Sequence, residues 1–583
     1  MGGEVFTFSL FGTLFAVVFY AISVSPSLLP RRWWWHAFVS GTLMGLGYAL
    51  GVAVSSLVNY LFAITGISID APPDTVEVAT YALVIAVVIW AARAVIGSFW
   101  ASKRAAALTG MKPIKFPEYM LGMFLSLPMF GIVLAAIQFL LWVFSLVVGL
   151  LDRWLFHPLS VLIAIGAVLV LIFLVSNKVV FKAIMAYFAY TAAKMNRTSS
   201  HKFAPPIVPE RSASPESLST WDSVGGQGRT FLTLGPSASD IEAVTGRPAM
   251  EPVRTYAGID GPSPDLGQIA KQAVAELKRA GGLDRAVVIV YTATGSGWVD
   301  QWLIQPAEYL TAGNCATVSM QYSYLFSAAL LVSDLETCAE AGVALFEAVE
   351  KAVDELPVDR RPLVIVAGES LGAYGSQAPF EDLQDLNQRT DGAIWVGSPQ
   401  GSRLSQLLTN ERHRGSPEVA PVVRSARNAR FINNPQLLDQ DLFGRELGPW
   451  DFPRSVFVQH ASDPVVWYTP RLMIEEPDWL RERVGLDVSR SMRYTPIATY
   501  LQVLTDLPIA GTAPPGHGHT YHRELIEVWM RVLGFDQDQA FGRVGDTAWA
   551  TREMKSHIGT AIERDQLRVV RATDLQRAAR SQQ

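Results

Sequence analysis

A serine near the middle of the chain has the surroundings of a catalytic nucleophile. Ser370 is the centre of a Gly-x-Ser-x-Gly pattern, with Gly368 and Gly372 on either side. The β-branched run 363–366 precedes this pattern, and an Ala/Gly/Ser-rich stretch that can begin a helix follows it. A strand, a sharp turn and a helix in this order are typical of the nucleophile elbow. The two glycines fit, because a Cβ in such a turn would clash with neighbouring backbone.

A nucleophilic serine needs a base to take its proton, and the base needs an acid to hold it in place. In doubly wound hydrolases the chain order is serine, then acid, then histidine. Asp463 lies just after the predicted strand Val456–Gln459, which is where the acid belongs. An ordinary Asp-Pro turn is the alternative interpretation. Asp451 is a weaker rival, because it precedes the strand.

Four histidines follow Asp463 and compete for the role of base: His517, His519, His522 and His557. The first two lie in a Gly/Pro-rich loop directly before a predicted helix, which suits a base that reaches back over the sheet edge. His522 is already entering that helix, and His557 lies in the C-terminal tail. Spacing alone does not decide whether His517 or His519 is the base.

An oxyanion hole needs backbone N–H groups that face the developing negative charge. The amide of Leu371, directly after the nucleophile, is one expected donor. The second is expected from the glycine-rich loop after strand Ala286–Thr292, at Thr294 or Gly295. This loop lacks the Walker lysine and a complete Gly-x-Gly-x-x-Gly, which disfavours a nucleotide site. Ser296 in the same loop is a weaker candidate nucleophile.

Composition separates the chain into two parts. Half of the 583 residues are hydrophobic and 17% are charged, and the charged residues are scarce in the first 175 positions. A net charge of -5 without basic blocks indicates no nucleic-acid partner. Cys315 and Cys338 have no neighbouring ligands at metal-binding spacing and read as core residues. We expect no metal and no organic cofactor.

The N-terminal part contains five apolar segments long enough to cross a bilayer. They cover Val5–Ser25, Ala37–Ile64, Val78–Ile96, Tyr119–Leu151 and Leu155–Val175. The shorter segment Val179–Ala193 is expected to be an interfacial helix, although it could be a sixth span. Lysine and arginine are concentrated in alternate loops, and the positive-inside rule then places the C-terminal part in the cytoplasm. A sixth span would reverse that orientation.

The whole pattern predicts an α/β architecture behind a transmembrane helical region. Residues 1–196 form the membrane region, 197–220 a linker, 221–550 an α/β-hydrolase domain, and 551–583 a charged tail. Strands alternate with helices in the third range, which predicts a mostly parallel, doubly wound sheet. Residues 397–453 show no strand rhythm and are expected to form a cap insertion over the sheet. Arg229–Leu234 is a weak strand candidate.

Several motifs together resemble a family of bacterial membrane-anchored α/β-hydrolases, common in actinobacteria, that carry an N-terminal multi-span region. The matching stretches are Thr294–Asp300, Gln321–Leu325, Gly368–Gly372, Ser462–Pro464 and Gly516–Tyr521. The resemblance covers nearly the whole chain and implies the α/β-hydrolase fold and a Ser-Asp-His triad. The histidine pattern of the family, Gly-x-Gly-His-x-Tyr, falls on His519 and favours it over His517.

The expected activity is that of a membrane-integral serine hydrolase of the esterase or lipase type. Its substrate would be a lipid or another membrane-associated ester, because tethering to a plasma membrane has little purpose for a freely soluble substrate. An acyltransferase or a peptidase would use the same triad. The alternative from a different class is a catalytically inactive scaffold or transport protein. Few ionisable residues lie within the spans, which argues against transport.

Overall fold

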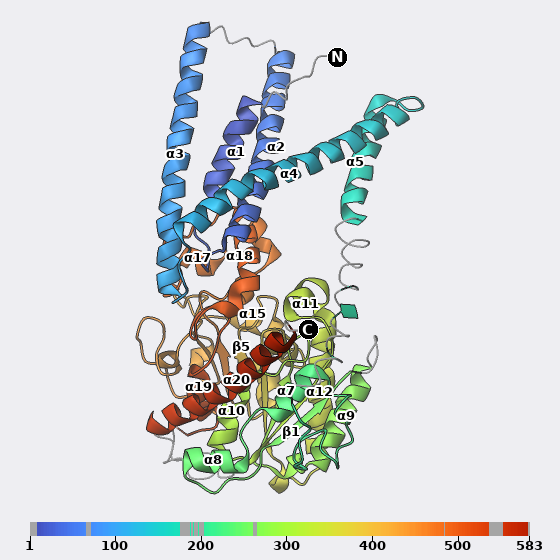
Figure 1. Cartoon of the computed structure of the whole chain (residues 1–583), viewed down its shortest axis with the longest axis vertical. Coiled ribbons are helices and arrows are strands. Elements are labelled where there is room, and N and C mark those ends of the chain that lie inside the picture. Colours follow the sequence, from blue (N-terminus) through green and yellow to red (C-terminus); the bar gives the residue numbers. More distant parts are fainter. Residues whose placement is uncertain are drawn as a thin grey trace. The chain divides into compact units, whose positions relative to one another are not determined.

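The computed structural model describes residues 9–65, 72–174, 187, 190–191, 196, 203–259, 265–482, 484–535 and 552–580. Contacts divide the chain into two compact units, which are described separately (Figure 1). The first, Met1–Ile184 with Tyr468–Ala513, is here called the helical unit. The second, Met185–Trp467 with Pro514–Gln583, is called the sheet unit.

Five apolar helices begin the helical unit: α1 Leu10–Ser23, α2 Trp33–Thr65, α3 Pro73–Leu108, α4 Phe116–Leu151 and α5 His157–Phe173. Three of them, α2, α3 and α4, are long and apolar enough to cross a membrane. Each of the five predicted spans therefore coincides with a helix, but α1 and α5 are shorter in the described part of the chain. The segment Val179–Ala193 lies almost wholly outside the described residues.

Glycines allow the apolar helices to approach one another closely. A Cβ at Gly45 of α2 would lie 2.3 Å from Val133 of α4, and one at Gly51 would lie 2.5 Å from the carbonyl oxygen of Phe11 in α1. Small residues at helix contacts are typical of membrane bundles, where packing rather than the hydrophobic effect holds helices together. The helical unit therefore has the contacts as well as the composition of a transmembrane region.

The segment Tyr468–Ala513 belongs to the helical unit, although it lies between the predicted acid and base in the sequence. It contains α17 Asp478–Glu482 and α18 Ala498–Asp506. Ala498 packs with Val39 and Leu43 of α2. The side-chain amide of Gln502 donates to the Ser25 hydroxyl at 2.9 Å, in the loop between α1 and α2. This segment is therefore built into the helical bundle.

The sheet unit is organised around seven strands that pair in parallel throughout, in the order β1-β3-β2-β4-β5-β7-β6. The strands are β1 Val253–Ala257, β2 Val287–Thr292, β3 Cys315–Met320, β4 Leu363–Glu369, β5 Gly392–Val396, β6 Ala429–Ile432 and β7 Arg454–Val458. Their residues are buried on both faces, as expected for a parallel sheet covered by helices. The predicted doubly wound, mostly parallel α/β architecture is confirmed.

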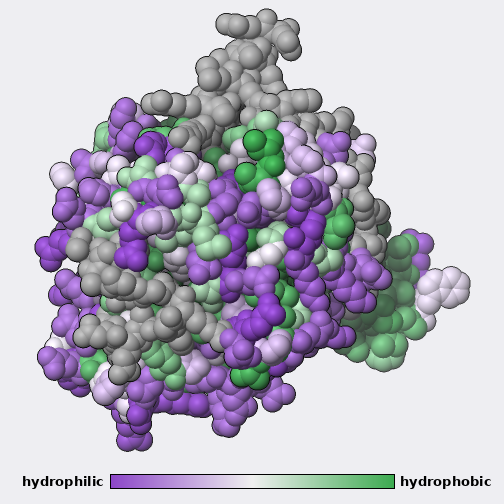
Figure 2. Space-filling model, turned by 90° about the horizontal axis from the view of Figure 1, so that it is seen from below, coloured by the Kyte–Doolittle hydropathy of each residue, from purple (hydrophilic) through white to green (hydrophobic). Residues whose placement is uncertain are grey.

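Helices cover both faces of this sheet and alternate strand residues separate the two apolar layers. One layer contains Ile289 with residues of α10 Gln301–Leu310, α19 Glu524–Val532 and α20 Arg552–Arg580. The other contains Val288 with residues of α9 Leu266–Arg279, α12 Leu335–Asp354 and α13 Leu371–Gln377. The remaining helices of the unit are α7 Gly225–Thr233, α8 Ala238–Thr245, α11 Ser327–Ser333, α14 Leu383–Arg389, α15 Arg403–Asn410 and α16 Pro464–Trp467. The face of this unit seen in Figure 2 is mostly hydrophilic, whereas α3 and α4 expose many large apolar side chains.

One expectation from the sequence was wrong, and two ranges contain structure that the sequence did not indicate. Residues 229–233, a weak strand candidate, belong to helix α7, which packs Gly228 against the Tyr256 ring. The range 397–453 is not only a cap, because it supplies the edge strand β6. Within the expected linker, residues 210–214 run beside β1, where the Ser212 amide donates to the Arg254 carbonyl at 3.0 Å. In each case packing against the sheet overrides the local sequence signal.

Candidate active site

The Ser370 turn has the geometry of a nucleophile elbow. Ser370 directly follows β4 and has φ 55° and ψ -124°, a conformation that costs a non-glycine residue about 1–3 kcal/mol. Its amide donates to the carbonyl oxygen of Val396 at the end of β5, at 2.9 Å. Helix α13 begins at the next residue, Leu371. The strained turn therefore presents the serine at the carboxyl end of the sheet, at a helix N-terminus.

The two elbow glycines are required by the backbone around them. A Cβ at Gly368 would lie 2.4 Å from the carbonyl group of Gly372, and one at Gly372 would lie 2.2 Å from the Thr292 carbonyl oxygen. Both contacts are with main-chain atoms, which cannot move aside as a side chain can. This is the steric reason that the sequence pattern suggested.

The structure brings Asp463 and His519 together. His519 Nδ1 lies 2.7 Å from Asp463 Oδ2, and the Asp463 side chain is fully buried. The His519 ring remains 14% exposed. The carboxylate is held in turn by the amide of Val465, which donates to Oδ1 at 2.9 Å. A buried carboxylate bonded to Nδ1 fixes the imidazole with Nε2 available for proton transfer.

The loop that carries His519 is tied to the turn that carries Asp463. The Tyr521 hydroxyl donates to Asp463 Oδ2 at 2.7 Å, and the Gly518 amide donates to Ser462 Oγ at 2.9 Å. His460 Nδ1 lies 2.9 Å from the Gly518 carbonyl oxygen, and the His460 ring stacks on Tyr521 at 4.0 Å. Sequence analysis gave no role to Tyr521 or His460; the tyrosine of the Gly-x-Gly-His-x-Tyr pattern was the available signal.

Gly397 is a further residue of the site that sequence analysis missed. It follows β5 with φ +57°, and a Cβ there would lie 2.5 Å from His519 Cε1 and 3.1 Å from Asp463 Oδ2. Its neighbour Val396 accepts the Ser370 amide. The end of β5 therefore lies against both the serine turn and the histidine ring. A glycine directly after a predicted strand was its sequence signal.

The predicted oxyanion donors are only partly available. Leu371 is the first residue of α13, and amides in the first turn of a helix lack an intrahelical acceptor. The Thr294 amide, in contrast, donates to the Trp298 carbonyl at 2.9 Å within its own turn. The Gly295 amide makes no hydrogen bond to the residues that the structure describes. Of the two expected loop donors, Gly295 is therefore the one that remains open.

The glycine-rich loop after β2 is held by a glutamine that directly follows β3. Gln321 Nε2 donates to the carbonyl oxygens of Ser296 and Ser323, at 3.0 Å each. The Tyr256 hydroxyl donates to the Gly297 carbonyl at 2.8 Å. These bonds, with the Thr294–Trp298 backbone bond, fix a compact turn after β2.

Three carboxylates, those of Asp463, Glu369 and Asp300, influence the pKa of the His519 imidazole. Burial raises the pKa of Glu369 and that of Asp300. The charge of Asp463 raises the pKa of Glu369 further, and the charge of Glu369 does the same for Asp300. Burial alone would lower the pKa of His519, but Asp463, then Glu369 and Asp300, outweigh it and raise that pKa to about 9. The negative charge around His519 therefore stabilises the protonated form of its imidazole.

The rival residues occupy other places. Asp451 forms an ion pair with Arg427 at 2.8 Å, with both side chains partly exposed. His522 stacks on Trp302 at 4.7 Å, and burial lowers its pKa. The backbone of His517 pairs with that of Thr520 in the turn of the histidine loop. The imidazole that bonds Asp463 is that of His519, the residue favoured by the family pattern.

The predicted core cysteines are buried. Cys315 lies in β3, and Cys338 of α12 donates to the Leu371 carbonyl at 2.9 Å. Burial raises the pKa of both thiols to about 12. Within the described ranges, no group of three or more His, Cys, Asp or Glu side chains is arranged to hold a metal ion.

Comparison with protein families gives two matches. Residues 253–541 match the model of an alpha/beta-hydrolase family, and residues 24–236 match the model of the N-terminal region of that family. Neither the curated proteins nor the solved structures that were compared gave a match. The two family matches together run from residue 24 to residue 541, in agreement with the parallel sheet and the serine elbow. The chain therefore belongs to an alpha/beta-hydrolase family.

Proposed function

We propose that this protein is a membrane-integral serine hydrolase of the esterase or lipase type, with Ser370, His519 and Asp463 as its triad. The observation that carries the proposal is the 2.7 Å contact between His519 Nδ1 and buried Asp463. The end of β5 lies against this pair and also accepts the amide of Ser370, which has the strained elbow conformation. Family membership supports hydrolase chemistry in general. The triad and the ester substrate are our inference.

In the proposed reaction, Ser370 Oγ attacks the ester carbonyl carbon while His519 Nε2 takes the serine proton. The amides of Leu371 and Gly295 stabilise the oxyanion of the tetrahedral intermediate. His519 then gives the proton to the leaving alcohol, which departs and leaves an acyl-serine. Water attacks this acyl group, its proton passes to His519, and Ser370 is released with the carboxylic acid. No metal or organic cofactor enters these steps.

The proposed substrate is an ester of a lipid or of a cell-envelope component. The argument is the apolar helical region, which would keep the enzyme at a membrane. We further propose a multi-pass plasma-membrane protein whose sheet unit faces the cytoplasm. The basis is the concentration of lysine and arginine in alternate loops and the helix ends beside them. The clearest example is Lys103 and Arg104 near the end of α3, with Lys112 and Lys115 between α3 and α4.

A fluorophosphonate probe tests the proposal, because it labels only an activated serine. The wild-type protein should be labelled and should hydrolyse p-nitrophenyl esters, whereas Ser370→Ala should lose both properties and still insert into membranes. Ser296→Ala is the matched control and should keep them. Absence of labelling in the wild type would favour an inactive scaffold, and persistent labelling of Ser370→Ala would place the nucleophile elsewhere. Labelling with transfer of the acyl group to an added alcohol or amine would favour an acyltransferase.

A further inference from the structure

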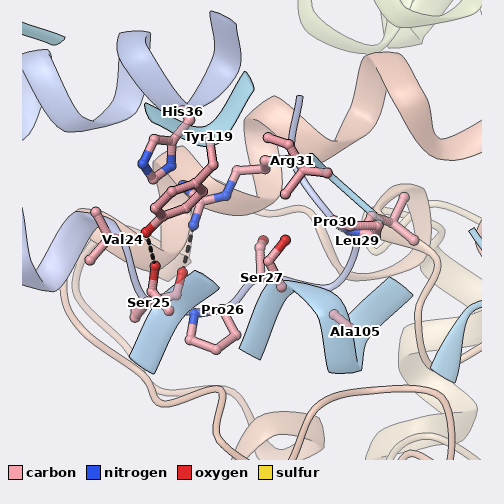
Figure 3. A pocket seen from close by; sticks show the side chains of 13 residues that line it. Val24, Ser25, Pro26, Ser27, Leu29, Pro30, Arg31, His36, Ala105 and Tyr119 are labelled. Atoms are coloured by element: carbon pink, nitrogen blue, oxygen red, sulfur yellow. Dashed lines mark hydrogen bonds between the residues drawn. The ribbon is translucent and has the colours of Figure 1, made fainter. Parts of the chain in front are cut away.

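A polar cavity lies within the helical unit, where the loop between α1 and α2 meets the start of α2, the end of α3 and the start of α4 (Figure 3). Its polar lining includes Ser25, Ser27, Arg31, His36, Ser98 and Tyr119. The cavity volume is about 30 Å³. On this measure one water molecule needs about 10–15 Å³, so the cavity has room for two oxygen atoms.

The cavity contains a buried cation. The Arg31 side chain is buried, and its Nη atoms donate to the carbonyl oxygens of Ser23 and Ser25. A guanidinium has five N–H donors, and these bonds do not use all of them. The carbonyl groups are neutral, so they also do not cancel the positive charge of Arg31. The nearby carboxylate is Asp506 of α18, which accepts from the Ser27 hydroxyl and the Leu29 amide. Burial raises the pKa of Asp506 to about 7, against the opposite effect of the Arg31 charge.

An unsatisfied imidazole nitrogen lies on the same cavity. His36 is 5% exposed, and its Nε2 has no hydrogen-bond partner in the part of the chain that the structure describes. Its ring packs on the Tyr119 ring, with 5.1 Å between the centroids. The Tyr119 hydroxyl is already bonded to Ser98 and to the Val95 carbonyl, so it does not satisfy His36. Buried polar groups are normally bonded, so this nitrogen has capacity for a further partner. In the tautomer that carries hydrogen on Nε2, it would donate to an oxyanion.

The cavity lies where membrane headgroups are expected. It is located at the ends of three apolar helices: the start of α2, the end of α3 and the start of α4. Trp33, Trp34 and Trp35 begin α2, and Lys103 lies over the Phe99 and Trp100 rings near the end of α3. Aromatic and basic residues mark the membrane–water interface. Basic pockets between membrane helices at this depth suit anionic lipid headgroups.

We propose that this cavity is a binding site for the phosphodiester group of an anionic membrane phospholipid, with the Arg31 guanidinium and His36 Nε2 as its two polar anchors. The two non-bridging phosphate oxygens match the space for two oxygen atoms. The acyl chains would remain in the bilayer beside α2, α3 and α4. The site is separate from the triad and does not depend on the proposed hydrolase activity.

The experiment uses the full-length protein, delipidated in detergent, and measures lipid retention by native mass spectrometry. The probes are phosphatidylglycerol, phosphatidylcholine and inorganic phosphate. Wild type should retain phosphatidylglycerol in preference to the other two. Arg31→Gln should weaken retention by about tenfold or more, since a charge-assisted bond is lost. Arg32→Gln is the matched control, because Arg32 is exposed and lies over the Trp34 ring at 4.0 Å, and it should retain the lipid.

Arg31 also holds two loop carbonyls, so a second variant separates binding from folding. His36→Phe keeps an aromatic ring against Tyr119 and removes Nε2, and it should weaken retention while the protein stays monodisperse. Equal retention by wild type and both variants would overturn the proposal. Equal losses in Arg31→Gln and Arg32→Gln would also overturn it, because they would indicate surface attraction alone. Inorganic phosphate that competes as well as the lipid would show a free-oxyanion site and refute the lipid assignment.

Discussion

The hydroxyl of Tyr521 lies 2.7 Å from Oδ2 of Asp463, the same oxygen that bonds His519. The tyrosine therefore holds the carboxylate that is proposed to orient the base. Removing its hydroxyl leaves the carboxylate with one donor fewer on the oxygen that orients the base. Tyr521 is thus a positioning residue of the proposed triad.

Tyr521→Phe should lower kcat by about tenfold, because a hydrogen bond to a charged group contributes roughly 1.5 kcal/mol. KM should change little, since the hydroxyl faces Asp463. Steady-state ester hydrolysis gives both constants. Tyr324→Phe, whose hydroxyl donates to the Ile259 carbonyl instead, is the matched control. Equal effects of the two substitutions would argue against a specific role for Tyr521.

The pH dependence should reflect the carboxylates around His519. A general base must be neutral, so kcat/KM should rise with pH and level off above the His519 pKa of about 9. Glu369→Gln removes a negative charge that raises this pKa, and the rising limb should move to lower pH. Glu381→Gln, at an exposed position, should leave the limb in place. An unmoved limb in Glu369→Gln would show that Glu369 does not act on the base.

The two histidines of the same loop should differ in their effect on turnover. His519→Ala should cost roughly three orders of magnitude or more, as loss of a triad base does. His517→Ala should cost far less, because His519 is the ring that bonds Asp463. The comparison needs ester hydrolysis with active-site titration of each variant. A larger loss in His517→Ala would reverse the assignment.

The side of the membrane can be tested with single cysteines at Pro72 and Ile207. Both positions are exposed, Ile207 at 86%. The native Cys315 and Cys338 should not be labelled, because they are buried and burial raises the pKa of their thiols. In intact cells an impermeant maleimide should label position 72 alone if the sheet unit faces the cytoplasm. Labelling of both positions would place that unit outside, and labelling of both only after permeabilisation would contradict the assignment of the loop at position 72.

The sequence predicted the sheet and the elbow because their signals are local. The strand before Ser370 is a continuous apolar run and the glycines around it mark the turn. Strand β6 was missed since it has four residues and a buried arginine in its middle. Arg430 is accommodated there by carbonyl oxygens of Ala426, Leu438 and Gly448 and by the Trp450 ring, which residue patterns do not reveal.

The same reasoning explains which parts of the site were found. Ser370 and Asp463 are marked by the strands that precede them, whereas spacing left His517 and His519 level and a family pattern separated them. Gly397 acts through a contact with His519, more than one hundred positions away in the sequence. Such a contact exists only after the sheet has formed, so no local sequence pattern predicts it.

The placement of Tyr468–Ala513 in the helical unit has a practical consequence for anyone who wants a soluble enzyme. The acid and the base of the proposed triad flank this segment, so cutting the chain between the membrane helices and the first strand does not release a self-contained hydrolase. A protein truncated in that way would carry α18 with the apolar surface of Ala498 and the polar side chain of Gln502 deprived of their partners on α2 and in the α1–α2 loop. Such a fragment should aggregate. A soluble form requires a second deletion, within the sheet unit's own sequence, that removes the segment Tyr468–Ala513. A short polar loop would then join Trp467 to Pro514.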